Sequence, residues 1–389
     1  MREVAIIGIG ETKFGELWDR SFRDIGIEAG LKAINDAKIT SNDINALYIG
    51  TMASGSLIKQ EHVSPILLDY AGLSSDHIPS IRIEAGEASG ALAFHQAYLA
   101  VASGYYNIVV VGGAEKLTDV SEDVARDITS STSDQEWETF FGVTQASQYA
   151  LIANKHMNTY NTKREAMAEV AVKNHYHGSM NSTAHFQNKI TVEAVLKSPP
   201  VSTPLGMLDC APLSDGAATV ILAPLDIARK FTDTPIKIQA STISTDTATL
   251  FHRRDICTFD STILASKKAY DLAGIGSSQL DLVELNDNYT ISEIIAIEDL
   301  NITKKGEAGK ELLNGRYRIG DKPSINTSGG LKAHGQPYGA VGIAQIVEIV
   351  KQLTGRAEKR TVNGAEIGLT HTIGGIGSVS VINILKRVN

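Results

Sequence analysis

Cysteine is scarce in this sequence, whose 389 residues include only Cys210 and Cys257. Two cysteines cannot build a disulfide framework or, by themselves, a zinc site, and a reducing cytoplasm is the simplest compartment for such a chain. Histidines, cysteines and carboxylates are not clustered at the spacings of metal ligands, which argues against a metal or redox cofactor. We therefore expect a cytoplasmic protein with no permanently bound cofactor.

Long runs of one kind of residue are also lacking. Lysine and arginine never follow one another beyond a pair, and the formal net charge is −8. This balance disfavours nucleic acid and anionic membrane surfaces as partners. No stretch of about 18 apolar residues could span a bilayer, and residues 1–8 enter a strand directly rather than through the apolar core of a signal peptide. We expect neither a nucleic-acid nor a membrane partner.

The apolar residues, 43% of the chain, alternate between short runs and stripes at helical spacing. The short runs predict strands at 4–9, 44–48, 81–83, 108–112, 219–222, 236–240, 282–285, 367–370 and 379–385. The stripes predict helices that include 87–102, 146–160, 163–176, 262–273, 291–300 and 343–353. Strands that alternate with helices predict an α/β fold with a parallel sheet covered on both faces, and the repetition of this logic at both ends predicts an internal duplication.

The stretch 81–112 has the clearest local pattern, which is strand, tight turn, buried helix and strand. Residues 84–86 are too small and flexible to extend the first strand, and the helix from Glu87 to Ala102 is apolar on almost every face. Partial positive charge collects at a helix start, so Glu87 stands where an anion or a nucleophile would be stabilised. Taken alone, an acidic residue in the first turn of a helix is also commonplace.

Three glycine-rich turns, at 84–90, 326–342 and 371–377, have the character of a strand end that faces a helix start. Active sites of α/β folds collect at such places, so we expect these turns to meet. Between the two sheet-building ends, residues 117–139 are polar and indicate an excursion over the surface. We interpret roughly 117–203 as an inserted, lid-like subdomain.

These motifs resemble the thiolase family, most closely its archaeal and sterol-carrier-protein-linked branch, over nearly the whole chain. The matching segments are residues 8–15, 83–90, 172–175, 209–218, 328–335 and 371–377. The resemblance implies a thiolase fold of five layers, αβαβα, built from two similar halves with an inserted loop domain. The implied boundaries are residues 1–116 and 204–231 for the N-terminal half, 117–203 for the inserted loop domain and 232–389 for the C-terminal half.

The resemblance also implies ligands and assembly. It predicts a pocket for acyl-coenzyme A (acyl-CoA), which is a substrate or ligand rather than a permanent cofactor, and a dimer or tetramer. Its substrate-binding positions are Ala211, where a hydroxyl often found in the pocket is absent, and three glycines, Gly335, Gly374 and Gly375.

The sequence departs from the family where chemistry happens. Thiolases transfer acyl groups through a cysteine at the start of the buried helix, and this chain has Glu87 there. Gln336 replaces the histidine of the Gly-His-Pro turn, and it can donate a hydrogen bond but cannot take up a proton. The two remaining catalytic positions match, as Asn286 and His371. Because a carboxylate forms at best a mixed anhydride, we expect cysteine-dependent Claisen or thiolytic acyl transfer to be lost or altered.

Two functions stay open on these grounds. In the first, an acetyl-CoA acetyltransferase-like protein binds acyl-CoA and runs a noncovalent decarboxylation or retro-Claisen reaction. His371 then acts as acid and base, Asn286 and Gln336 donate to the oxyanion, and Glu87 stands in the nucleophile's place. In the second, the chain is a non-catalytic partner or scaffold subunit that associates with an active thiolase or a small OB-fold protein.

Other residues near the motifs have competing interpretations. His371 beside glycines is either a loop histidine or the family base. His334, two residues before Gln336, either replaces the missing imidazole or faces solvent. Cys210 and Cys257 are better interpreted as small buried or surface residues than as nucleophiles, because neither opens a helix after a strand.

Overall fold

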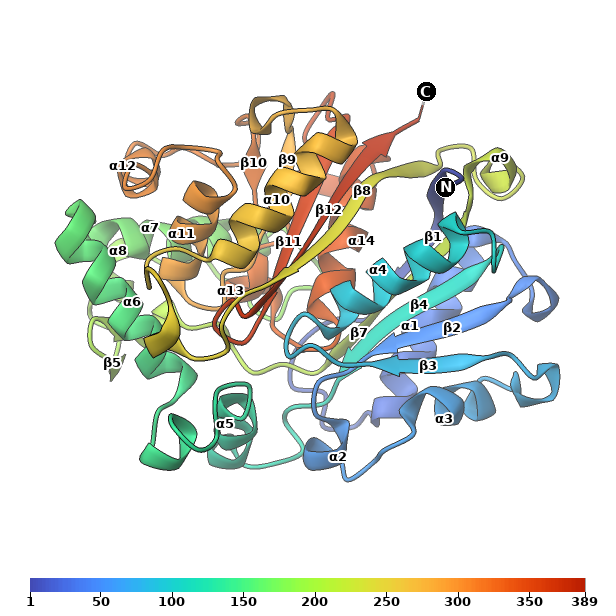
Figure 1. Cartoon of the computed structure of the whole chain (residues 1–389), viewed down its shortest axis with the longest axis horizontal. Coiled ribbons are helices and arrows are strands. Elements are labelled where there is room, and N and C mark those ends of the chain that lie inside the picture. The colour runs from blue at the N-terminus through green and yellow to red at the C-terminus, as the bar shows by residue number, and fades with distance from the viewer. Residues whose placement is uncertain (389) are drawn as a thin grey trace.

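The computed structural model describes residues 1–388 and contains one ten-stranded sheet and a separate two-stranded sheet (Figure 1). The strands of the large sheet are β1 (Val4–Glu11), β2 (Ala46–Gly50), β3 (Ser80–Ile83), β4 (Val109–Glu115), β7 (Gly216–Pro224), β8 (Ile236–Thr245), β9 (Leu282–Glu284), β10 (Ser324–Ile325), β11 (Ile367–Gly374) and β12 (Val379–Arg387). The strand order is β10-β9-β11-β12-β8-β1-β7-β4-β2-β3.

The sheet consists of two halves with the same topology. The order β3-β2-β4-β7-β1 in the N-terminal half is repeated as β10-β9-β11-β12-β8 in the C-terminal half. In each half the first three strands are parallel and the last two are antiparallel to their neighbours. Within the sheet of residues 1–388, the halves join where β1 meets β8, through the pairs Ala5 with Lys237 and Ile6 with Ile236. The predicted duplication is therefore confirmed.

Helices form three further layers around the two halves. The helices α4 (Ser89–Ala102) and α14 (Val341–Leu353) contact each other and strands of both halves, so they form a central layer. The outer face of the N-terminal half carries α1 (Phe22–Ala37), and that of the C-terminal half carries α10 (Asp260–Ala273). The result is the expected αβαβα order. Shorter helices at the periphery are α2 (Ser54–Leu57), α3 (Val63–Tyr70) and α9 (Leu225–Ala228).

The segment between β4 and β7 contributes no strand to the ten-stranded sheet within residues 1–388. It contains α5 (Glu122–Ser130), α6 (Gln145–Tyr160), α7 (Arg164–Gly178), α8 (Val192–Leu196) and the small sheet of β5 (Pro200–Ser202) and β6 (Leu205–Gly206). Its helices pack on three helices of the C-terminal half, which are α11 (Thr290–Asp299), α12 (Ala308–Leu313) and α13 (Gly330–His334) (Figure 1). The segment thus covers the side of the sheet where the glycine-rich turns lie.

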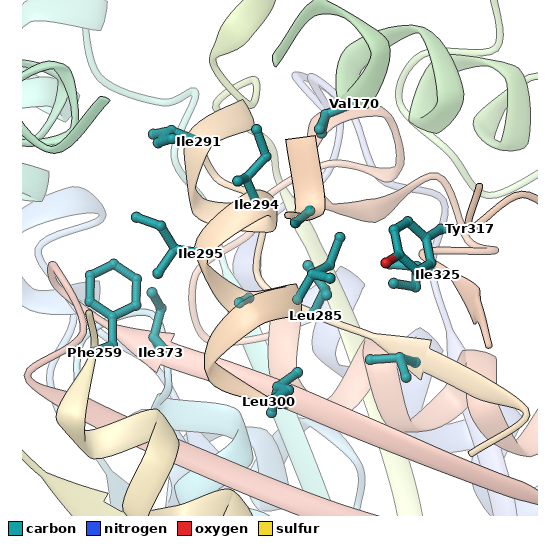
Figure 2. Close-up of a cluster of buried hydrophobic side chains, with 14 of the residues drawn as sticks. Val170, Phe259, Leu285, Ile291, Ile294, Ile295, Leu300, Tyr317, Ile325 and Ile373 are labelled. Atoms are coloured by element: carbon teal, nitrogen blue, oxygen red, sulfur yellow. The ribbon is translucent and has the colours of Figure 1, made fainter. Parts of the chain in front are cut away.

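Helix α11 is buried on every face and anchors the loop that carries Asn286. Figure 2 shows the apolar side chains of α11 and those that surround it, from the inserted segment, the sheet, the loop before β10 and the residue before α10, namely Val170, Phe259, Leu285, Ile291, Ile294, Ile295, Leu300, Tyr317, Ile325 and Ile373. Full burial of one such side chain stabilises the fold by about 1.5–3 kcal/mol. The loop 286–289 between β9 and α11 is therefore held firmly at both ends.

Among the element boundaries that differ from the sequence predictions, two change where a candidate site residue lies. Helix α4 begins at Ser89 rather than at Glu87, because the Ala85 N–H donates to Ser89 Oγ and closes a turn before the first helical residue. Strand β11 runs on to Gly374, so His371 lies inside a strand, opposite Ile382, and not in the turn that follows. No helix within residues 1–388 has the length and apolar character that a membrane crossing requires.

Candidate active site

The Glu87 carboxylate lies buried in the turn between β3 and α4, and both of its oxygens accept hydrogen bonds. The Gln145 side-chain amide, from the first residue of α6, donates to Oε1 at 2.5 Å, and the backbone N–H of Gly375 donates to Oε2 at 2.6 Å. Glu87 is 1% exposed, and this burial raises the pKa of its carboxyl above the ordinary value, against the effect of the two hydrogen bonds. Glu87 therefore holds a proton at higher pH than an exposed glutamate, which suits an acid or base.

Two of the glycine-rich turns touch at this point. A Cβ atom added to Gly374 would lie 2.2 Å from the carbonyl oxygen of Ala85. Only a residue without a side chain allows this approach, and the approach is what brings the Gly375 N–H to Glu87. The third turn also arrives here, since a Cβ on Gly90 would lie 2.3 Å from the carbonyl oxygen of Gly339. The structure thus brings the three predicted turns together.

Asn286 and Gln336 carry buried polar atoms without hydrogen-bond partners. Asn286 is 1% exposed and neither atom of its side-chain amide is bonded, and Gln336 is 5% exposed with its Nε2 unbonded. An unsatisfied buried polar group costs about 1–3 kcal/mol, so such groups are rare and call for an explanation. Two amides of this kind can donate to the carbonyl oxygen of a ligand.

The segment 210–214 connects the loops that carry these two amides. Cys210 forms an isolated backbone bridge with Tyr289, and Leu213 forms one with Gln336. In addition, the Ala211 N–H donates to the carbonyl oxygen of Asn288 at 2.8 Å. Of the predicted substrate-binding residues, Ala211 and Gly335 therefore border this segment, whereas Gly374 and Gly375 border Glu87.

Three tyrosines lie near Glu87, two of them buried and one, Tyr289, half-buried, and the sequence interpretation missed them. Burial raises the pKa of Tyr149, Tyr289 and Tyr338, and the nearby charge of Glu87 raises each of these pKa values further. The rings of Tyr149 and Tyr289 stack with centroids 4.6 Å apart, and the Tyr338 hydroxyl is 2.6 Å from Thr129 Oγ1. Tyr289 and Tyr338 directly follow motif residues, which was an available signal. Tyr149 lies on a helix outside the motifs.

His371 is directed away from this cluster. Its Nε2 lies 3.0 Å from the hydroxyl of Thr262 on α10, and its Nδ1 has no partner. The next residue, Thr372, points to the opposite face of β11 and donates to Gln345 on the central helix α14. Burial alone lowers the pKa of His371 to about 3, so its ring is neutral and a weak base near neutral pH. The structure does not bring His371 to Glu87, and its expected role as acid and base there lacks geometric support.

The two interpretations of His334 are both wrong. Its ring is 5% exposed, so it does not face solvent. Its Nε2 lies 3.0 Å from Glu11 Oε1 and its ring stacks on Phe14 at 4.6 Å, so it does not replace the missing imidazole either. The N-terminal loop after β1 folds over this residue, which its position in the sequence could not reveal.

The cysteines do not supply the missing thiolate. Burial raises the pKa of Cys210 to about 12 and that of Cys257 to about 11, so both remain protonated thiols near neutral pH. No group of three or more histidines, cysteines or carboxylates within residues 1–388 is placed to hold a metal ion. The chemistry available at this site is therefore that of a buried carboxyl, two free amides and phenols.

Comparison with known proteins places these residues in a family context. The family model "Thiolase, N-terminal domain" matches residues 4–226, and "Thiolase C-terminal domain-like" matches residues 242–387. The chain is 50% identical to an acetyl-CoA acetyltransferase of Methanothermobacter thermautotrophicus over 100% of both chains. It is 30% identical to sterol carrier protein 2 of Rattus norvegicus, over 98% of this chain and 72% of that protein.

Two solved structures share the fold. A Ltp2-ChsH2(DUF35) aldolase has a TM-score of 0.84 and 25% sequence identity, covering 98% of this chain and 97% of that chain. Human mitochondrial 3-ketoacyl-CoA thiolase in complex with CoA has a TM-score of 0.78 and 18% identity, covering 100% of this chain and 98% of the other.

Proposed function

The chain belongs to the thiolase family, and from this premise we propose that it binds an acyl-CoA and acts at its α carbon without an acyl-enzyme. One observation carries the proposal. Where the family has its cysteine, a buried carboxylate accepts one hydrogen bond from Gln145 and one from Gly375. A carboxylate held in this way is fixed as an acid or base, and it is a poor nucleophile because both of its oxygens are engaged.

The reaction classes that suit this site pass through a thioester enolate. In decarboxylation of a malonyl thioester, the bond from Cα to the carboxylate breaks and its electron pair moves to the thioester oxygen. Asn286 Nδ2 and Gln336 Nε2 donate to that oxygen, and the protonated Glu87 carboxyl then gives its proton to Cα. The products are an acetyl thioester and CO₂, and water restores the proton on Glu87.

A retro-Claisen cleavage uses the same groups. The thiolate of free CoA attacks the 3-keto carbon of a 3-ketoacyl-CoA, the bond between Cα and that carbon breaks, and the same enolate leaves. Glu87 protonates the enolate, and the proton lost by the CoA thiol balances the reaction. The products are acetyl-CoA and a shortened acyl-CoA, with no covalent bond to the protein.

The alternative is a non-catalytic subunit, and an exposed aromatic cluster favours it. Trp137, Phe140 and Phe141 are 67–75% exposed and precede α6, whose Gln145 holds Glu87. The name of the Ltp2-ChsH2(DUF35) aldolase joins two components, which supports a partner protein for this chain. In this version the chain docks an active thiolase or a small OB-fold protein, and in either version we propose a dimer or tetramer of the chain itself.

A product profile distinguishes the two proposals. The purified protein is incubated with malonyl-CoA, and in parallel with acetoacetyl-CoA plus free CoA, and the thioesters are followed by mass spectrometry. We expect acetyl-CoA to form, and we expect Glu87→Gln to lower its rate by about a hundredfold or more, because a positioned acid or base contributes that much. Glu366→Gln is the matched control, since Glu366 is exposed and outside the candidate site.

Two results would count against the enzymatic proposal. Thioesters returned intact by the wild-type protein would favour the partner subunit, and co-purification with an active thiolase would then be the next measurement. Turnover that is unchanged in Glu87→Gln would exclude Glu87 as the proton donor.

A further inference from the structure

Arg253 is a buried cation without an ion-pair partner. It is 9% exposed, and its Nε and Nη1 atoms form no hydrogen bond. Its Nη2 makes one long hydrogen bond, 3.5 Å, to the carbonyl oxygen of Thr247, and the guanidinium lies over the ring of Phe259, 5.2 Å from its centroid. Its neighbour Arg254, by contrast, is exposed and donates to both carboxylate oxygens of Asp260. Within residues 1–388, Arg253 has no carboxylate in contact.

The acidic residues near Arg253 are engaged with other groups. Glu138 accepts hydrogen bonds from the Leu250 N–H at 2.9 Å and from the Gln148 side-chain amide at 3.2 Å. Asp246 accepts one from the Thr247 N–H at 2.6 Å. Burial lowers the pKa of Arg253, and the charges of these carboxylates counteract part of that effect. None of them accepts a hydrogen bond from its free N–H donors. Such an unsatisfied buried guanidinium is costly, and a bound anion would remove that cost.

Arg253 adjoins a surface hollow in sequence and is linked through Tyr149 to the candidate active site. The Tyr149 phenol and the Arg253 guanidinium are close enough for each to shift the pKa of the other, and Tyr149 is also within reach of the Glu87 charge. A surface hollow of about 670 Å³ is lined by residues 247–249, Phe251 and His252, which immediately precede Arg253 in sequence, together with Asp134 and Trp137. An anion at Arg253 would therefore lie on the side of the candidate site where Tyr149 follows Gln145, the residue that donates to Glu87, by one helical turn of α6.

We infer that Arg253 binds a carboxylate at the far end of the acyl group, so that the substrate is the CoA thioester of a dicarboxylic acid. The inference rests on the proposed function, because it places the thioester carbonyl at Asn286 and Gln336. A guanidinium matches a carboxylate with several N–H donors in one plane, which a lysine cannot do. Glu87, whose pKa is raised by burial, tolerates a second carboxylate in the site when it is protonated.

The test compares two thioesters that are matched in chain length. The Kd of succinyl-CoA and of butyryl-CoA is measured by isothermal titration calorimetry for the wild-type protein and for Arg253→Met, Arg253→Lys and Arg254→Met. We expect the wild type to bind succinyl-CoA at least about tenfold more tightly, since hydrogen bonds to charged groups contribute at this level. Arg253→Met should lose the preference and keep its affinity for butyryl-CoA, and Arg254→Met should behave as the wild type.

Each other outcome has a defined meaning. Equal affinities in the wild type would overturn the inference and leave thioester binding intact, whereas no binding of either thioester would overturn the proposed function as well. If Arg253→Met weakens both CoA thioesters but not the matching pantetheine thioesters, Arg253 binds a CoA phosphate and the inference is wrong. If Arg253→Met fails to fold, two results decide the inference: the preference of the wild type for succinyl-CoA over butyryl-CoA, and the expected reduction of that preference in Arg253→Lys.

Discussion

At the residue scale, Glu87 accepts a hydrogen bond from a backbone N–H that would otherwise be free to donate to a ligand. The Gly375 N–H points at the carboxylate, and backbone N–H groups of this kind are the usual donors to an oxyanion. Because the protein's own side chain takes this donor, the proposed reaction assigns stabilisation of the substrate oxygen to Asn286 and Gln336, whose amide nitrogens are free. The carboxylate thus resembles an acyl group that is already bound.

His371 should make the fold sensitive to acid. Its pKa is lowered to about 3 in the folded state, against about 6.5 when unfolded, so between these values only the unfolded chain binds the proton. Stability is therefore lost as the pH falls through 6.5, by about 2 kcal/mol at pH 5 for this one histidine. We expect His371→Asn to remove that part of the loss, measured by urea unfolding at pH 7 and pH 5.

Two comparisons complete the test of His371. His77→Asn replaces an exposed histidine and should leave the acid loss unchanged. An equal loss in all three proteins would contradict the expectation. A fall in turnover of a hundredfold or more in a folded His371→Asn protein would restore the role of acid and base that the geometry does not support.

Residue identities at this site were predictable only where a motif named them. Glu87, Asn286 and Gln336 lie in recognisable segments, and the structure places all three in or beside the converging turns. The misplacement of His371 in a turn has a simple physical origin: the predicted strand ended at Thr370, so the alternation that puts His371 on one face with Leu369 and Ile373 was not applied. Arg253 could not be found from sequence, because only the fold shows that it lacks a partner.

At the element scale, the contact between the two turns depends on Gly374. In Gly374→Ala the new methyl group would collide with the carbonyl oxygen of Ala85, so the turns must separate and the Gly375 N–H must move away from Glu87. We expect a loss of stability of about 1–3 kcal/mol from overpacking, together with loss of turnover. The matched control is Gly276→Ala, where no atom lies within 4 Å of the new Cβ. Unchanged turnover in Gly374→Ala would show that the Gly375 hydrogen bond is dispensable.

Element types were easier to predict than element ends. Helix α4 is apolar on nearly all faces, so its burial followed from composition. The start of α4 did not follow from composition, because the hydrogen bond from the Ala85 backbone N–H to Ser89 Oγ places the first helical turn after Glu87. Helix α5 lies in the polar stretch 117–139 and buries only a few residues, among them Ala125 and Thr129. The sequence there therefore gave little apolar signal for a helix.

At the scale of the whole molecule, the two halves depend on their shared central layer. The sheet joins them through only two residue pairs between β1 and β8, whereas α4 and α14 contact strands of both halves. Alternating strands and helices were sufficient to predict a duplication. They could not show which helices are shared, because that depends on close contacts such as the one between Gly342 and Ala91.

This architecture predicts that the two halves unfold together. A Cβ on Gly342 would lie 2.6 Å from the Cβ of Ala91, so Gly342→Ala forces the two central helices apart, at a cost of about 1–3 kcal/mol. Native-state hydrogen exchange should then show the slowest amides of β4 and of β11 losing the same free energy of protection. In Gly30→Ala the new methyl group meets no atom within 4 Å on the outer helix α1, and it should stabilise both strands slightly. If Gly342→Ala lowers protection in β4 and leaves β11 unchanged, the halves are separate cooperative units and the central layer belongs to one of them.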